Sequence, residues 1–179
     1  VPNWQLRLNE LHEELAQEVN PTLILIMEAA QKNGVSCITD DDDLSLGMGK
    51  TSQTWPIDEL PALQDIQWHT YKDIPRALIT GTNGKSTSVR LASHIAKAAG
   101  FVAGVTSTDF IRVGDDIIDN GDYSGPGGAR MLLRDSRTEI AFLEVARGGI
   151  LRRGIPIDSV DAALITNVAS DHLGQYGIN

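Results

Sequence analysis

The sequence predicts an α/β fold in which helices cover both faces of a mostly parallel sheet, preceded by a small helical N-terminal segment. Two observations lead to this prediction. After residue 75, short apolar runs alternate with amphipathic stretches, which is the pattern of parallel strands joined by crossover helices. Before residue 35, apolar residues recur instead at intervals of three and four, which is the spacing of one helix face.

The N-terminal segment is expected to hold two helices and a short strand. Asn3 is a candidate N-cap for the first helix, while Asn20 and Pro21 are residue types favoured at the start of the second. Gly34 suits the end of the second helix, and residues 35–39 are predicted to form a strand. The apolar face of the first helix consists of Trp4, Leu8, Leu11, Leu15 and Val19.

Residues 40–75 are expected to be irregular. Four consecutive aspartates, Asp40–Asp43, two glycines and three prolines interrupt any period in this stretch. We place a boundary near Ile74 and Pro75, which divides the chain into an N-terminal part, residues 1–74, and a second domain, residues 75–179.

The second domain contains four apolar runs of buried-strand length and one amphipathic stretch. The amphipathic stretch predicts a helix over residues 86–99 that ends at Gly100. Residues 111–118 are expected to form a hairpin that turns at Gly114–Asp116. The strands are predicted at 77–79, 102–106, 140–145 and 162–166. The inward-facing residues of the helix are predicted to be Val89, Ala92, Ile95, Ala96 and Ala99.

Composition narrows the class of protein. Fifteen basic residues stand against 24 acidic ones, a formal net charge of -9, so sequence-independent nucleic-acid binding is not expected. Cys37 is the only cysteine, which excludes an internal disulfide. Apolar runs are far shorter than the ~20 residues of a spanning helix, and the N-terminus lacks the pattern of a signal peptide. We therefore expect a soluble cytoplasmic protein without a membrane partner, and leave open whether it forms oligomers.

A glycine-rich loop lies directly between a predicted strand and a predicted helix. Its glycines allow successive amides to face one anion, the helix N-terminus adds a positive dipole, and Lys85 adds a full charge. Ser86 can offer its hydroxyl to Mg²⁺. The sequence therefore predicts a P-loop-type sheet with a nucleotide phosphate site. The residues of this phosphate loop are Gly81, Thr82, Asn83, Gly84, Lys85, Ser86 and Thr87.

Two features refine the motif. The general pattern has a further glycine where this chain has Ile79, which argues against an ordinary P-loop GTPase or kinase. A second stretch, Gly47–Thr51, also ends in Gly-Lys-Thr, but no apolar strand precedes it and Trp55-Pro56 follows too soon for a helix. We interpret this second stretch as a loop without a nucleotide role.

Two candidate metal ligands and a basic cluster follow other strands. Glu144 comes at the end of an apolar run, and His172 lies a few residues beyond another. Ligands gather at the carboxyl ends of parallel strands, so both residues are expected near the phosphate loop, although an ordinary strand-terminal glutamate and a solvated histidine remain the alternatives. Arg147, Arg152 and Arg153 are either a solvated basic turn or contacts to phosphate or to a carboxylate substrate.

Taken together, these motifs resemble the central domain of the Mur ligase family. The resemblance runs from about Ile74 to the end of the sequence and, within that family, is closest to the Mur-like half of the cyanophycin synthetases. Several motifs in order are more specific than one glycine-rich loop. The similar segments are Thr80–Thr87, Thr106–Asp109, Gly121–Pro126, Glu144–Arg152, Thr166–Val168 and Asp171–Gly174.

The resemblance implies a ligase that uses ATP to phosphorylate a substrate carboxylate, after which an amine attacks the acyl phosphate and an amide bond forms. By the same resemblance, Lys85 would neutralise the transferring phosphoryl group, Ser86 and Glu144 would hold one Mg²⁺, and His172 would help to hold a second. Its partners would be a small-molecule or peptide carboxylate and an amino-acid amine. Positioning and charge neutralisation dominate such phosphoryl transfers.

The sequence also departs from the family pattern. It ends at Asn179, before the position of the family's modified lysine and before the family's C-terminal domain, so activity of these residues alone is not expected. The substrate cannot be inferred from the sequence. Two other classes stay open: a different ATPase or kinase that shares only the loop, and a non-catalytic ATP-binding module.

Overall fold

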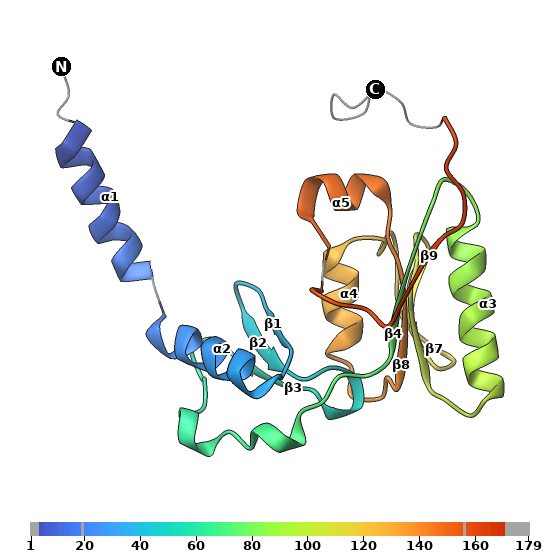
Figure 1. Ribbon diagram of the computed structural model, residues 1–179, viewed down its shortest axis with the longest axis horizontal. Coiled ribbons are helices and arrows are strands. Elements are labelled where there is room, and N and C mark those ends of the chain that lie inside the picture. Colours follow the sequence, from blue (N-terminus) through green and yellow to red (C-terminus); the bar gives the residue numbers. More distant parts are fainter. Residues whose placement is uncertain (1–3, 19, 156, 171–179) are drawn as a thin grey trace.

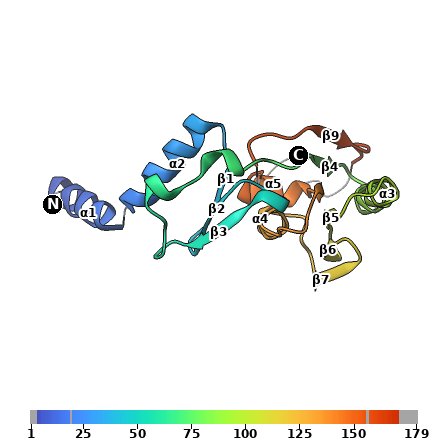
Figure 2. The ribbon, with the colours of Figure 1, turned by 90° about the horizontal axis from the view of Figure 1, so that it is seen from below.

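The computed structural model describes residues 4–18, 20–155 and 157–170 of the chain. Figures 1 and 2 show two parts, an N-terminal part built on two helices and a small sheet, and a larger α/β part. The larger sheet stands between helix α3 on one side and helices α4 and α5 on the other (Figure 1). The predicted α/β class, with helices on both faces of the sheet, is confirmed.

The N-terminal part begins with helices α1 (Trp4–Glu18) and α2 (Pro21–Asn33). The Asn20 side chain accepts a hydrogen bond from the Leu23 amide at 3.0 Å, and Gly34 ends α2, so both predicted caps are confirmed. The predicted apolar face of α1 is not buried, because Trp4, Leu8 and Leu11 are exposed. Asn3 and Val19 lie outside the described residues, as does the side chain of Leu15.

A small antiparallel sheet follows, formed by β1 (Cys37–Thr39), β2 (Asp43–Leu46) and β3 (Gln53–Pro56). The expectation of irregular chain over residues 40–75 was therefore wrong for β2 and β3. Asp40 accepts hydrogen bonds from the amides of Asp42 and Asp43, at 3.2 and 2.9 Å, so the aspartates make the turn between two strands. Three short 3₁₀ turns complete the segment, at Gly49–Thr51, Leu63–Asp65 and Trp68–Thr70.

In the larger part, the described strands form a six-stranded sheet in the order β7-β6-β5-β8-β4-β9. β5, β8, β4 and β9 run parallel, and the β6–β7 hairpin adds two antiparallel strands at one edge. The predicted hairpin and the four predicted strands are confirmed to within two residues. The strands are β4 (Arg76–Thr80), β5 (Ala103–Thr106), β6 (Phe110–Val113), β7 (Asp116–Asn120), β8 (Ile140–Glu144) and β9 (Ala162–Ile165).

Three helices accompany this sheet in the part of the chain that the structure describes: α3 (Lys85–Ala98), α4 (Pro126–Leu133) and α5 (Arg147–Arg153). The predicted inward face of α3 is partly wrong, because Ile95 is 63% exposed and Ala99 is also exposed, while Ser93 is buried. The Ser93 hydroxyl donates to the Arg90 carbonyl and accepts from Arg112, so its burial leaves no unmet hydrogen bond. Val89 and Ala96 are buried as predicted.

β9 differs from the buried strand that its apolar sequence suggests. It pairs with β4 and lies at the edge of the described sheet, where Leu164 and Ile165 are 47% and 65% exposed.

No helix in the described part of the chain is long and apolar enough to cross a bilayer.

One hydrophobic cluster crosses the predicted boundary at residue 75. Ile38, Met48 and Ile74 pack with buried residues of the larger part, among them Leu132 and Leu143. The two parts approach each other closely at Gly49, where a Cβ atom would lie 2.3 Å from the Thr138 carbonyl oxygen. The division of the chain into domains at residues 1–74 and 75–179 stays a prediction. The two parts share a hydrophobic core.

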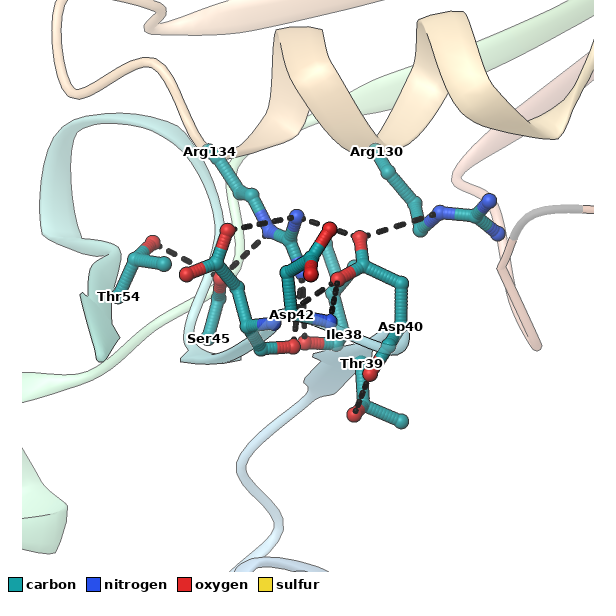
Figure 3. A network of polar contacts seen from close by, with 9 residues as sticks. Ile38, Thr39, Asp40, Asp42, Ser45, Thr54, Arg130 and Arg134 are labelled. Carbon is teal, nitrogen blue, oxygen red and sulfur yellow. Dashed lines mark hydrogen bonds and ion pairs between the residues drawn. The ribbon is translucent and has the colours of Figure 1, made fainter. Parts of the chain in front are cut away.

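Arg134, the residue after α4, joins the small sheet to the larger part (Figure 3). Its guanidinium donates to the Asp40 carboxylate at 2.7 Å, the Ser45 hydroxyl at 2.8 Å and the Asp43 carbonyl at 3.1 Å. Arg130 lies 3.8 Å from the same Asp40 carboxylate. Burial raises the pKa of Asp40, but hydrogen bonds from Arg134 and from the backbone of Asp43 and Asp42 outweigh it, so this pKa lies below its usual value.

We expect Arg134→Ala to lower the free energy of unfolding by about 2–3 kcal/mol, because it leaves several acceptors of the small sheet without their donor. Arg137→Ala is the matched control, since the Arg137 side chain is 49% exposed and pairs with aspartates at the surface. The control should cost at most about 0.5 kcal/mol. Urea denaturation measures both, and equal losses would contradict the role given to Arg134.

The same network predicts a dependence on pH. Because the folded-state pKa of Asp40 is depressed, its contribution to stability is complete above the unfolded-state value of about 3.9. That contribution is lost as the pH falls through the folded-state pKa. Asp40→Asn should therefore lower stability at neutral pH and flatten its decline in acid, whereas Asp41→Asn, at an exposed position, should leave the acid profile unchanged. Denaturation curves at a series of pH values give the comparison.

Candidate functional site

The predicted phosphate loop joins β4 to α3 at the carboxyl end of β4. Gly81 has a φ of +133°, and a Cβ atom there would lie 2.1 Å from the Thr166 hydroxyl oxygen, so this position accommodates only glycine. The first turn of α3 leaves amides without intrahelical acceptors, as every helix start does. The loop therefore presents donors and a positive helix end at one edge of the sheet.

Lys85, the first residue of α3, folds back over this loop. Its ammonium group donates to the carbonyl oxygens of Gly81 and Thr82, at 2.9 and 3.0 Å. These two bonds keep the positive charge at the centre of the loop, where a phosphate group would meet it.

Ser86 and Glu144 lie together beside the loop. Glu144 ends β8 with 2% of its surface exposed, and burial raises the pKa of its carboxyl group. The Ser86 hydroxyl, the Thr108 backbone and the charge of Lys85 offset part of this rise. These groups lie near the Glu144 carboxylate but outside hydrogen-bond geometry. Both carboxylate oxygens are therefore buried without a hydrogen-bond partner among the described residues.

A buried carboxylate without partners is costly, and native structures retain such groups mainly where another ligand completes them. Oxygen atoms of a carboxylate and a hydroxyl are the ligands that Mg²⁺ prefers. Glu144 and Ser86 therefore fit a small divalent cation held beside a phosphate group.

The predicted basic cluster lies on α5, which follows β8. Arg147 and Arg152 border the same pocket as the phosphate loop, a hollow of about 640 Å³ that Ile165, Asn167 and Val168 also line. Arg152 and Arg153 border a smaller adjoining hollow of about 180 Å³, next to the N-terminal end of α4. The Arg152 Nε donates to the Gly148 carbonyl oxygen at 3.2 Å.

Sequence reasoning placed Lys85, Ser86 and Glu144 at one edge of the sheet, and the structure has them there; Arg147 and Arg152, for which two interpretations were open, border the same pocket. His172 lies outside the described residues, so its predicted position beside them stays a prediction. The geometry adds Thr108, whose hydroxyl lies 3.3 Å from that of Ser86, and Asn167, which contacts the loop. Both residues come just after a predicted strand, and this position in the sequence could have identified them as candidate site residues.

The second Gly-Lys-Thr stretch has a structural role. The Lys50 amide donates to the Thr138 carbonyl at 2.9 Å, and the Lys50 ammonium lies 3.4 Å from the Glu139 carboxylate. A 3₁₀ turn, Gly49–Thr51, replaces the helix that a phosphate site would need. The interpretation of this stretch as a loop agrees with these contacts.

Another hollow, of about 620 Å³, lies between α2, β1 and residues 157–159. Its one buried cation, Arg76, already donates to Ser159 and Ile74 and pairs with Asp73 at 3.0 Å. Among the described residues, this hollow has no helix start, and its carboxylates, Glu28 and Asp158, are exposed, whereas Glu144 is buried without a hydrogen-bond partner, so we place the candidate site at the loop.

Comparison with known proteins agrees with this site. The Mur ligase middle domain matches residues 79–178. Cyanophycin synthetases of Crocosphaera subtropica and Geminocystis herdmanii are 49% and 52% identical over 106 residues, which is 59% of this chain and 12% of each relative. A UDP-N-acetylmuramoyl-L-alanyl-D-glutamate--2,6-diaminopimelate ligase of Leptospira interrogans is 31% identical over 110 residues, 59% of this chain and 22% of the relative.

The matched region thus accounts for a small share of each relative, but for more than half of this chain. It begins at Ile79 in β4 and contains the phosphate loop, the β8 strand with Glu144, and α5. On this match, and on the fold and site that accompany it, the chain belongs to the Mur ligase family, and its residues 79–178 match the family's middle domain.

Proposed function

We propose that this protein is an ATP-dependent ligase that forms amide bonds, of the Mur ligase and cyanophycin synthetase type. The observation that carries the proposal is the buried, unpartnered Glu144 carboxylate beside Ser86 and a lysine-bearing phosphate loop. A divalent cation held beside nucleotide phosphates would give such a carboxylate the partner that it lacks. The names of the similar proteins support the class of reaction, since one is a synthetase and another a ligase.

Glu144 and Ser86 would hold Mg²⁺, directly or through water, because both present oxygen atoms at the same edge of the sheet. When bound, the cation supplies charge neutralisation at the phosphate oxygens. Following the family resemblance, we extend the proposal to His172 as a ligand of a second cation.

Lys85 would exchange its two carbonyl acceptors in the loop for phosphate oxygens, which offer a stronger, charge-assisted bond. In this role it neutralises charge on the phosphoryl group that passes to the substrate carboxylate. The amides of the first turn of α3 would receive the remaining phosphate oxygens.

Arg147 and Arg152 are the candidate contacts to the acid substrate. Both border the pocket that the phosphate loop lines, and guanidinium groups bind carboxylates with two parallel hydrogen bonds. The class of substrate that follows is an amino-acid or peptide carboxylate, joined to the amine of an amino acid.

Turnover assays on the full-length protein separate this function from the alternatives. A ligase releases ADP and phosphate only when both a carboxylate acceptor and an amine are supplied, and the product contains a new amide bond. ATP turnover that is indifferent to the amine would favour another ATPase or kinase. Tight ATP binding without turnover under any substrate combination would favour a non-catalytic nucleotide-binding module.

For the loop lysine, we expect Lys85→Ala to weaken ATP binding roughly ten- to a hundredfold, because a charge-assisted hydrogen bond contributes about 1.5–3 kcal/mol. Lys50→Ala serves as the control, since Lys50 stands in the same tripeptide but pairs with Glu139. Isothermal titration calorimetry with ATP and Mg²⁺ measures both affinities. Similar losses for the two variants would mean that the second stretch also binds nucleotide.

For the carboxylate, we expect Glu144→Gln to lower ATP turnover, to raise the Mg²⁺ concentration that turnover requires, and to stabilise the nucleotide-free protein. The stabilisation, about 1 kcal/mol or a few degrees in Tm, arises because the variant no longer buries an unpartnered charge. Calorimetric melting and turnover over a Mg²⁺ series are the two measurements. A less stable variant that keeps its response to Mg²⁺ would rule out the cation role.

A further inference from the structure

The segment that follows β9 is bonded to the phosphate loop along residues 166–169. The Thr166 hydroxyl donates to the Asn83 carbonyl oxygen at 2.7 Å, and the Asn167 side-chain amide donates to the same oxygen at 3.0 Å. The Asn167 side-chain oxygen accepts from the Asn83 amide at 3.0 Å, and its backbone oxygen accepts from the Thr82 amide at 2.9 Å. The Ala169 amide donates to the Thr82 hydroxyl at 3.0 Å.

These bonds fix the peptide plane between Asn83 and Gly84. In a trans peptide the C=O and N–H bonds point in opposite directions. Two donors hold the Asn83 carbonyl toward Thr166 and Asn167, so the Gly84 amide must point away from them. That direction leads toward the start of α3, where anions are received.

The same bonds divide the loop amides into two groups. The amides of Thr82 and Asn83 are already bonded to Asn167 and cannot serve a phosphate without losing that partner. The amides from Gly84 onward belong to the start of α3, where helix geometry supplies no acceptor. A phosphate would therefore meet the later amides and Lys85.

We propose that Thr166 and Asn167 are positioning residues of the nucleotide site: they hold the phosphate loop so that the amides of Gly84, Lys85 and Ser86, but not those of Thr82 and Asn83, receive the phosphates. This inference rests on the proposed function, because it assumes that the loop binds ATP. Neither residue needs to touch the nucleotide phosphates for this role. The side chain of Asn167 is exposed, so its replacement does not open a cavity in the core.

The test uses the full-length protein with Asn167→Ala, Thr166→Val and Thr166→Ser. Thr166→Val removes the hydroxyl and keeps the shape, whereas Thr166→Ser keeps the hydroxyl. Asn33→Ala is the matched control, because Asn33 is an exposed asparagine on α2 whose side chain bonds only a local carbonyl, that of Ala29, among the described residues. ATP affinity is measured by calorimetry, and exchange of the loop amides is followed by hydrogen–deuterium exchange with and without ATP and Mg²⁺.

We expect Asn167→Ala and Thr166→Val each to weaken ATP binding about tenfold, because each variant loses one or two of the hydrogen bonds that hold the phosphate loop in place. Thr166→Ser should restore binding to within about twofold of the unsubstituted protein, and Asn33→Ala should not change it. Without nucleotide, Asn167→Ala should speed exchange of the Asn83 amide. In the unsubstituted protein, ATP should slow exchange at Gly84, Lys85 and Ser86 and leave Thr82 and Asn83 unchanged.

The possible failures are distinct. If the unsubstituted protein does not bind ATP, the proposed function falls, and the inference falls with it. If it binds ATP but Asn167→Ala and Thr166→Val bind equally well, the inference alone is overturned. Protection by ATP at Thr82 and Asn83 would overturn it too, whatever the affinities. A loss in Thr166→Ser as large as that in Thr166→Val would assign the effect to packing rather than to the hydroxyl.

Discussion

Parallel pairing of β8, β4 and β9 is the constraint on which the site depends. Parallel strands end on the same side of a sheet, so their following residues meet there however far apart they stand in sequence. β4 leads into the phosphate loop, β8 ends in Glu144, and β9 leads into Thr166 and Asn167. The Glu144 carboxylate, proposed as a metal ligand, the phosphate loop and the residues bonded to that loop are thereby brought together without any contact local in sequence.

This constraint explains how much could be predicted from the sequence. Apolar runs between turn residues predicted β4, β5, β8 and β9, and their parallel arrangement predicted that Glu144 would lie near Ser86. The caps at Asn20 and Gly34 were predictable for a similar reason, because their chemistry is local. The helix α4 was not predicted, since the glycines that follow Pro126 have low helix propensity and only packing on the sheet compensates for them.

Other errors trace to tertiary contacts. The run Asp40–Asp43 suggests solvated chain, but Asp40 caps a turn and its carboxylate meets Arg134, a residue more than ninety positions away in the sequence. Ser93 is buried in place of Ile95 because Arg112, from the neighbouring hairpin, satisfies its hydroxyl. The bonds of Asn167 to the loop also depend on which strand lies beside β4. Pairings of this kind are set by topology, which residue periodicity does not record.

The open edge of β9 has a consequence for how this region behaves in solution. β9 is hydrogen-bonded to β4 on one side, and its apolar side chains, Leu164 and Ile165, are largely exposed in the described structure. An apolar edge strand with unpaired amides and carbonyls is a template for strand addition by another chain. Colloidal stability of this part of the chain therefore depends on a cover for β9, and without one it is prone to aggregate through the sheet edge closest to the phosphate loop.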